Sequence, residues 1–283
     1  MKDHNPSRTA LRVALRRAAH QFMDDPRVLD DPLAVPIVGK AIEEIQTDPR
    51  KFQSKIAKYF RAFMVARSRY AEDQLARALT RGTEQYLILG AGLDTSAYRG
   101  LGATSGIAVY EVDHPDTQAW KRARLAAAGI AIPEAVTYVA VDFERHTLPE
   151  QLAAAGFHEE LPTFVSWLGV VPYLTRKTAE ETFGYLGKLS EGSGVVFDYA
   201  VAPASLGLME RVAMKTLTQL VARAGEPFKL FFEPVELDEF LSPLGFRRIE
   251  QLGSQEINAR YFQGRTDGLR VAGGLGRIVA AWV

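Results

Sequence analysis

The stretch that decides the fold is residues 86–99, which read YLILGAGLDTSAYR. The first four residues are a short apolar run, typical of a buried strand, and Gly90 and Gly92 form a turn directly behind it. Glycines at such a turn let the backbone approach a ligand closely, and we expect a helix to begin there with its N-terminus favouring negative charge. A nicotinamide-binding fingerprint would have a third glycine at position 95, where this chain has Thr95. The pattern therefore indicates a ligand site behind the strand and weakens the dinucleotide interpretation.

More short apolar runs follow along the chain, and helical patterns separate them. The runs cover residues 107–112, 136–141, 163–168 and 194–199, and the helical patterns cover 116–128, 148–155 and 178–189. Short buried strands that alternate with helices favour a parallel sheet with helices on both faces. The predicted fold class is therefore α/β.

The first part of the chain lacks strands. Residues 7–23 and 51–79 have apolar side chains near helical spacing, and proline-containing breaks separate these two segments. The sequence therefore predicts an N-terminal helical part, residues 1–80, and a sheet-containing part, residues 81–283.

The last part of the chain also departs from the alternation. After helical patterns at 206–223 and 234–241, two strand-like runs at 246–252 and 277–283 are joined by a glycine-rich segment in which we expect no helix. Two strands joined in this way suggest an antiparallel pair that closes the sheet, an ending not expected of a nicotinamide-dependent dehydrogenase.

Composition excludes several classes of protein. The 283 residues include 34 Lys and Arg against 34 Asp and Glu, and no Cys. A net charge of zero gives no basic footprint for nucleic acid or anionic lipid, and the lack of Cys rules out disulfides and thiolate metal sites. No apolar run is long enough to span a membrane, and residues 1–17 do not resemble an export signal. We expect a cytoplasmic protein without a metal, a nucleic-acid partner or a membrane partner; the sequence leaves the oligomeric state open.

Acidic residues end the second and third predicted strands. Asp113 lies 21 residues after Gly92, and a carboxylate at this place can accept hydrogen bonds from both ribose hydroxyls. Glu111 lies on the same side of the strand and is an alternative, although Asp113 is nearer the ligand-binding end. At the end of the third strand, Asp142 can accept from an exocyclic amine and Phe143 can cover a base.

The ordered set of motifs resembles the leucine carboxyl methyltransferase-like family, which uses S-adenosyl-L-methionine and includes natural-product O-methyltransferases of the tetracenomycin carboxyl-methylating type. The segments that carry the resemblance are 9–11, 30–33, 86–99, 111–121, 141–143 and 167–174. The resemblance implies a class I methyltransferase with a Rossmann-like seven-stranded sheet, an antiparallel last strand and an N-terminal helical lid.

The resemblance also assigns residues to the cofactor. Gly90, Gly92 and Asp94 belong to the loop that passes its methionine part. Asp113 would hold the ribose, and Asp142 with Phe143 the adenine. Arg67 would pair with the methionine carboxylate, with Arg69 as the alternative; an arginine fork suits a carboxylate.

Two positions depart from the family pattern. Many methyltransferases have an acid where this chain has Ile88, and many relatives have Glu-Gly where this chain has Leu168 and Gly169. The second change lies where the acceptor would bind, so the identity of the acceptor does not transfer from the protein-methylating members.

The acceptor side is predicted from aromatic residues near strand ends. Trp167, Tyr173 and Tyr199 follow the fourth and fifth strands, where they either contact an acceptor or belong to the core. A carboxylate acceptor arrives deprotonated and needs no base, whereas a phenol is helped by one, for which His20 in the lid is the candidate.

We expect an O-methyltransferase acting on a small molecule, with a carboxylate of a polyketide-like intermediate favoured over a phenol. The alternatives from other classes are an NAD-dependent oxidoreductase and a non-catalytic binding domain.

Overall fold

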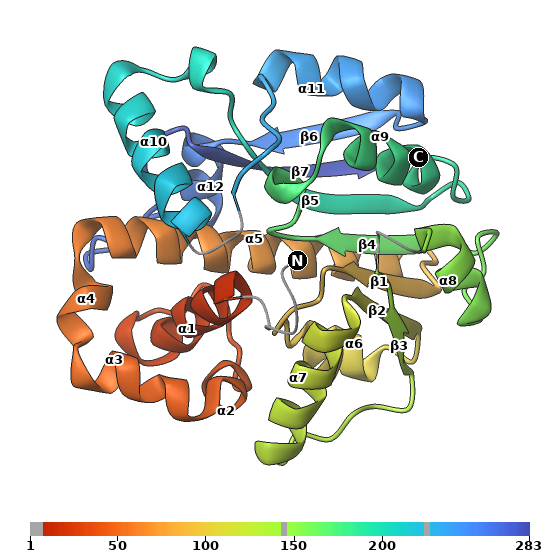
Figure 1. Ribbon diagram of the computed structural model, residues 1–283, viewed down its shortest axis with the longest axis horizontal. Helices are drawn as coiled ribbons and strands as arrows, with labels where there is room; N and C mark the ends of the chain where they lie inside the picture. The colour runs from red at the N-terminus through yellow and green to blue at the C-terminus, as the bar shows by residue number, and fades with distance from the viewer. Residues whose placement is uncertain (1–7, 143–145, 224–226) are drawn as a thin grey trace.

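A single seven-stranded sheet forms the centre of the computed structural model, which describes residues 8–142, 146–223 and 227–283 (Figure 1). The strands lie in the order β3-β2-β1-β4-β5-β7-β6. Their bounds are β1 Gln85–Leu89, β2 Ala108–Asp113, β3 Val136–Ala140, β4 Thr163–Trp167, β5 Gly194–Ala200, β6 Arg248–Leu252 and β7 Gly276–Trp282. Strands β1 to β5 pair in parallel, which confirms the predicted α/β class.

Strand β7 lies between β5 and β6 and is antiparallel to both. Its register places Ala280 opposite Val196 of β5 and opposite Glu250 of β6. The predicted antiparallel ending and the seven-stranded class I methyltransferase fold are therefore confirmed.

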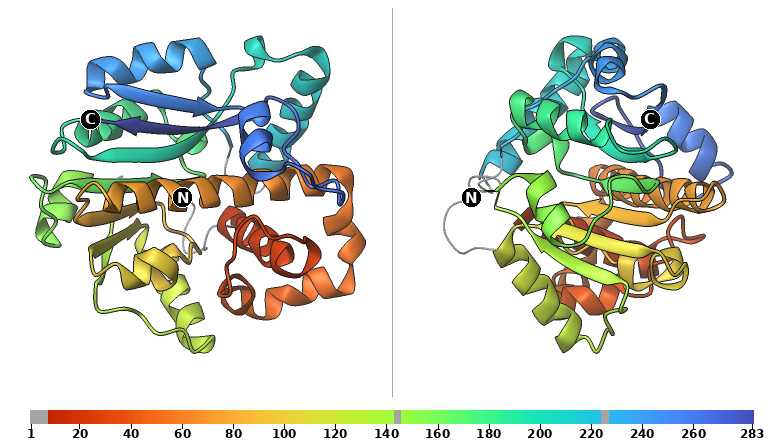
Figure 2. Two further views of the ribbon diagram at one scale, coloured as in Figure 1. Left: turned by 180° about the vertical axis from the view of Figure 1, so that it is seen from behind. Right: turned by 90° about the vertical axis from the view of Figure 1, so that its right-hand side faces the viewer.

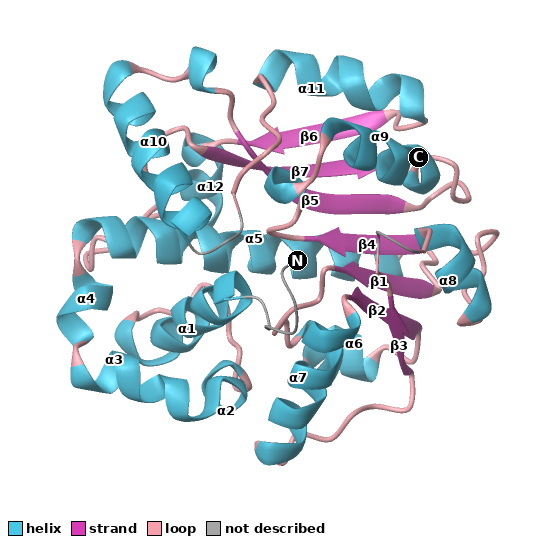
Figure 3. Cartoon of the chain, in the orientation of Figure 1, coloured by secondary structure: helices cyan, strands magenta, loops and turns pink. Residues whose placement is uncertain are grey.

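The expectation that no helix joins the last two strands is wrong. Helix α12, Ser254–Tyr261, lies between β6 and β7 (Figure 3). Its sequence is mostly polar, and it buries only Ile257, so the apolar spacing that indicates a helix is absent. The Glu256 side chain accepts from the Gly253 backbone N–H at 2.9 Å and fixes the start of the helix.

Helices cover both faces of the sheet (Figure 2). They are α1 Arg8–Met23, α2 Ala34–Val38, α3 Glu43–Thr47, α4 Pro49–Gln53, α5 Lys55–Leu79, α6 Gly100–Thr104, α7 Pro115–Ala127, α8 Leu148–Ala154, α9 Arg176–Leu186, α10 Leu208–Arg223, α11 Pro234–Leu241 and α12.

The predicted helix 51–79 is in fact two helices. Ser54 adopts an extended conformation between α4 and α5, and its hydroxyl caps α5 by accepting from the Ala57 N–H.

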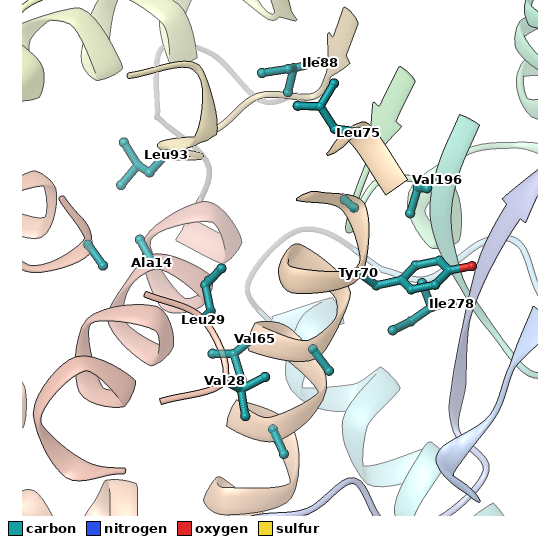
Figure 4. Packing of buried hydrophobic residues seen from close by; sticks show 14 of the residues in the cluster. Ala14, Val28, Leu29, Val65, Tyr70, Leu75, Ile88, Leu93, Val196 and Ile278 are labelled. Carbon is teal, nitrogen blue, oxygen red and sulfur yellow. The ribbon is translucent and has the colours of Figure 1, made fainter. Parts of the chain in front are cut away.

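Alternate side chains of the strands enter two separate cores, as the two-residue period of a strand requires. Tyr86 and Ile88 of β1 pack with α1 and α5, whereas Leu87 and Leu89 pack on the other face with α8, α9 and α11. Figure 4 shows the first core, in which Ile88 lies near Leu75 of α5. Ile88, which replaces the acid of many methyltransferases, is thus only 2% exposed among apolar neighbours.

That the N-terminal helices form a lid separate from the sheet-containing part remains a prediction. Helix α5 contacts β4 and β5, and α1 packs against α5 and α2. None of the helices in the described part of the chain combines the length and apolar character that a membrane crossing requires. The cytoplasmic location also stays a prediction.

Candidate active site

A cavity of about 840 Å³ opens at the carboxyl ends of the parallel strands. Its walls come from the loops that follow β1, β2, β3 and β4, and from the side chains of α1 and α5 that face these loops. Loops at this end of an open α/β sheet are where such folds bind ligands, and the volume falls within the range of small-molecule sites.

The glycine loop after β1 forms one wall of the cavity. Gly90 and Gly92 have φ angles of 67° and 47°, which other residues rarely adopt. A Cβ atom on Gly90 would also collide with Val170 Cγ2 of the loop after β4. Two loops of the site therefore meet at Gly90 with no room for a side chain.

The expectation that a helix begins at this turn is wrong. A short 3₁₀ turn, Ser96–Tyr98, comes next, and α6 begins only at Gly100. The ligand would therefore meet backbone groups of the loop rather than the N-terminus of a helix.

Asp113 lies beside the glycine loop at the end of β2 and lines the cavity. Its two carboxylate oxygens accept from the backbone N–H groups of Gly92, at 2.6 Å, and His114, at 2.7 Å. Burial raises the pKa of Asp113, and these two hydrogen bonds act in the opposite direction. Each oxygen keeps a second lone pair with which it can accept from a ligand hydroxyl.

The carboxylate of Glu111, the alternative acid, is already bound to other side chains of the protein. Its carboxylate accepts from Lys121 Nζ at 2.7 Å and from the Tyr98 hydroxyl at 2.8 Å, and the side chain is fully buried. It does not line the cavity, so Asp113 is the acid of this strand that a ligand can reach.

Asp94 lines the cavity from the end of the glycine loop. Its Oδ1 accepts from the backbone N–H and the hydroxyl of Ser96, and its Oδ2 lies 3.2 Å from Arg17 Nη1 of α1. Burial acts to raise the pKa of Asp94, but the charge of Arg17 and other groups outweighs it, so that the pKa lies below its ordinary value. Asp94 thus joins the loop to the first helix.

The adenine side is described only in part. Asp142 lines the cavity after β3, whereas Phe143 lies outside the described residues.

Arg67 lines the cavity from α5 and is 5% exposed. Its Nη1 lies 2.9 Å from Oδ2 of Asp198 on β5. The alternative, Arg69, is partly exposed and pairs with Asp73 along the same helix, at 2.8 Å. Only Arg67 therefore faces the cavity.

Asp198 is a residue that sequence reasoning missed. It lies in the run GVVFDYA of β5, all of which is buried. A buried carboxylate requires a cation or several hydrogen-bond donors as partners. An aspartate within an otherwise apolar strand was therefore the sequence signal that could have identified Asp198.

On the acceptor side, the structure brings together two of the three predicted aromatics. Trp167 and Tyr173 line the cavity, and the Trp167 ring packs edge-on against Phe183 at 4.8 Å. Tyr199 does not line it: its hydroxyl donates to Gln251 on β6 at 2.8 Å, and the residue is 1% exposed. The prediction that Tyr199 contacts the acceptor is therefore wrong, because β7 beside β5 allows its side chain to reach β6.

His20 is not placed to act as a base. It is fully buried in α1 and does not line the cavity. Its Nδ1 lies 2.8 Å from Asp24 Oδ2, and its Nε2 accepts from the backbone N–H groups of Val28 and Leu29. Both ring nitrogens hold the segment after α1, so the phenolic alternative loses its proposed base.

The sheet order, the inserted antiparallel strand and the glycine loop beside an acid define the class I methyltransferase fold. Solved structures share this fold. A DUF574 family protein from Streptomyces avermitilis matches with a TM-score of 0.57 at 15% identity, covering 99% of this chain and 98% of that one. A protein from Thermobifida fusca named as a methyltransferase matches with a TM-score of 0.56 at 14% identity, covering 99% and 96%.

Sequence comparison identifies the family. The model of the leucine carboxyl methyltransferase family matches residues 10–187. YktD of Bacillus subtilis, named as an S-adenosyl-L-methionine-dependent methyltransferase, is 32% identical over 95% of both chains. A Mycobacterium marinum protein with the same description is 34% identical over 70% of this chain and 67% of its own. The chain belongs to the leucine carboxyl methyltransferase family and is a methyltransferase, which removes the oxidoreductase and the non-catalytic alternatives.

Proposed function

We propose that this enzyme transfers a methyl group from S-adenosyl-L-methionine to an oxygen of a small molecule, and that the acceptor is a carboxylate of a natural-product, polyketide-like intermediate. The observation that best supports S-adenosyl-L-methionine as the methyl donor is the hydrogen bond between Asp113 and the glycine loop inside the cavity.

The cavity fits this donor. Gly90 and Gly92 leave backbone without side chains next to Asp113, which has lone pairs for the two ribose hydroxyls. Arg67 offers a guanidinium for a carboxylate, and its Nε is buried without a hydrogen-bond partner in the described structure. Asp142 would accept from the adenine amine.

S-adenosyl-L-methionine, when bound, would supply a methyl group activated by its sulfonium sulfur; in an in-line displacement, an acceptor oxygen would bond to the methyl carbon while the carbon–sulfur bond breaks and S-adenosylhomocysteine leaves. The residues of this chain hold the partners in place for that displacement and exclude water, and proximity of this kind can contribute about 7–11 kcal/mol. Thr9, Ala10 and Val13 of α1 form the lid side of the cavity, while Trp167 and Tyr173 would orient the acceptor.

The choice of a carboxylate rests on which charged groups lie near the acceptor side. Among the described residues that line the cavity, His114 is the single histidine, and it lies beside Asp113 on the ribose side. Lys229 also lines the cavity. Its backbone N–H donates to Pro172 O at 2.7 Å, next to Tyr173, and the residue is exposed. A cation without a nearby base favours an acceptor that arrives as an anion.

The donor is tested by calorimetric titration with S-adenosylhomocysteine and, separately, with NADH. We expect binding of the first only. Binding of NADH alone would contradict the proposed function.

The acceptor is tested with a series of aromatic carboxylic acids and matched phenols, followed as methyl transfer from the labelled donor. For a carboxylate, kcat/KM stays level between about pH 6 and 9, because the acid is already ionised. For a phenol it rises towards the phenol pKa of about 10.

The Lys229→Met variant then checks the charge argument. It should raise KM for the acid about tenfold, the size of one charge-assisted hydrogen bond, and leave S-adenosylhomocysteine affinity unchanged. Equal KM values in both enzymes would remove Lys229 from the acceptor site.

A further inference from the structure

The buried pair of Arg67 and Asp198 joins three elements of the fold. Arg67 lies on α5, Asp198 on β5, and Gly169 on the loop after β4. Asp198 Oδ2 accepts from Arg67 Nη1 at 2.9 Å, and Asp198 Oδ1 accepts from the Gly169 N–H at 2.6 Å. Each oxygen of one carboxylate therefore fixes a different wall of the cavity.

The position of the guanidinium is restricted on a second side. Gly169 has a φ of 72°, and a Cβ atom there would lie 2.8 Å from Arg67 Nη2 and 3.1 Å from Nη1. The arginine thus packs directly against the backbone of the loop, in space that only glycine leaves open. With one Nη held by Asp198 and the loop beside the other, the fork has little freedom to rotate.

The Arg67 guanidinium still has N–H donors available to a ligand. A guanidinium has five N–H donors, and Asp198 receives one of them. Nε is buried and has no hydrogen-bond partner within the described chain. Asp198 itself does not line the cavity, so any effect it has on a ligand passes through Arg67 or Gly169.

We propose that Asp198 is a positioning residue that aims the Arg67 fork at the methionine carboxylate of the donor; this inference rests on the proposed function. The negative charge of Asp198 offsets the desolvation of a buried guanidinium and fixes its orientation before the ligand arrives. A long side chain that is already ordered loses less entropy when it forms its hydrogen bonds to the ligand.

The test compares two ligands that share the adenosine and the sulfur, of which only one has the amino-acid end whose carboxylate Arg67 would hold. S-adenosylhomocysteine has the amino-acid carboxylate, whereas 5′-methylthioadenosine has the adenosine and sulfur but no carboxylate. In Asp198→Asn, titration calorimetry should show S-adenosylhomocysteine affinity reduced about tenfold or more, as expected for a disturbed charge-assisted hydrogen bond. Affinity for 5′-methylthioadenosine should stay within about threefold of the wild type, because the glycine loop and Asp113 are untouched.

A matched control lies on the same helix. The Tyr70 hydroxyl donates to Glu250 Oε2 of β6 at 2.6 Å, on the face of α5 away from the cavity. Tyr70→Phe should lower stability without changing the ratio of the two affinities. A second check is the Arg67→Gln background, in which Asp198→Asn should cause no further loss of S-adenosylhomocysteine affinity.

The outcomes separate this inference from the proposed function. If the wild type binds neither ligand, the proposed donor is wrong and the inference falls with it. If the wild type binds both and Asp198→Asn weakens both equally, the donor stands and the positioning role is overturned. Should Asp198→Asn fail to fold, Gly169→Ala replaces it, because its Cβ would displace the same guanidinium. Gly169→Ala must then lose affinity for S-adenosylhomocysteine while it keeps affinity for 5′-methylthioadenosine.

Discussion

Arg61 donates to both carboxylate oxygens of Asp24, from Nε to Oδ2 at 2.6 Å and from Nη2 to Oδ1 at 2.7 Å. The pair is almost completely buried and connects α5 to the segment after α1. His20 Nδ1 also lies 2.8 Å from Oδ2 of this carboxylate. A buried charge cluster outside the cavity therefore ties the segment after α1 to α5.

The first prediction concerns Asp24 and pH. Burial acts to raise the pKa of Asp24, but the hydrogen bonds from Arg61 and His20 outweigh it, so its pKa lies below the ordinary value. An acid with a lowered pKa in the folded state stabilises the fold above its unfolded pKa of about 4, and this contribution is lost as the pH falls through the lowered value. Asp24→Asn should therefore cost about 3–5 kcal/mol of unfolding free energy at pH 7 and progressively less below pH 4.

Urea unfolding across this pH range provides the measurement. Asp30→Asn is the control, because Asp30 is an exposed acid of the same segment that pairs with Arg27 at the surface. It should change stability by less than about 1 kcal/mol at any pH. A loss for Asp24→Asn that did not shrink on acidification would contradict the assignment.

The second prediction concerns His20. His20→Asn removes the acceptor of the Val28 and Leu29 N–H groups, and the unsatisfied donors should cost about 3 kcal/mol of stability. The kcat of the folded variant should fall less than about threefold, whereas loss of a general base costs 10²-fold or more. A large drop in kcat with unchanged stability would restore His20 as the base.

The third prediction concerns the contact between Gly90 and Val170. Gly90→Ala should lose both stability and at least about tenfold in S-adenosylhomocysteine affinity, which corresponds to 1.4 kcal/mol, because its Cβ would push apart the loops after β1 and β4. Gly129→Ala is matched to it: Gly129 has a φ of 66° against 67° for Gly90, and no atom lies within 4 Å of a Cβ at Gly129. It should show the backbone strain, about 1–2 kcal/mol, without the loss of affinity. Equal affinities in the two variants would argue against a role for the contact.

The fourth prediction concerns Asp113. Asp113→Asn should weaken S-adenosylhomocysteine by about 10- to 100-fold, because each hydrogen bond to a charged acceptor contributes about 1.5–3 kcal/mol. Burial raises the pKa of Asp113, so wild-type affinity should begin to fall at a higher pH than for an ordinary aspartate as the solution is acidified. The variant should lack this pH dependence. Titrations at several pH values check both points, and a variant that kept the wild-type affinity would exclude Asp113 from the ribose.

The sequence predicts β1, β4 and β5 well because every residue of these short apolar strands is buried. The run before Gly90 and the run ending at Asp113 are read correctly to within two residues. The acid at the end of β2 is also found, since chain order places it at the same sheet edge as the glycine loop. Helix α12 is missed because only Ile257 marks its buried side.

The partners of side chains are harder to predict, because they depend on residues far apart in the chain. Arg67 and Asp198 are 131 positions apart, and nothing local to either one indicates the other. Trp167 and Tyr199 occupy similar places near strand ends, yet only Trp167 lines the cavity. The difference arises from the strand inserted next to β5, which lies nearly 80 residues further along.

That inserted strand has a consequence for how the protein is made. On the ribosome, β5 and β6 are synthesised before β7, and each needs β7 as its neighbour in the finished sheet. Until residues 276–282 emerge, β5 has one unpaired edge and β6 has no strand partner. A direct pairing of β5 with β6 would leave no place for β7 and could trap the chain. Because β7 is synthesised after both of its neighbours, the part of the sheet that carries Asp198 is completed last.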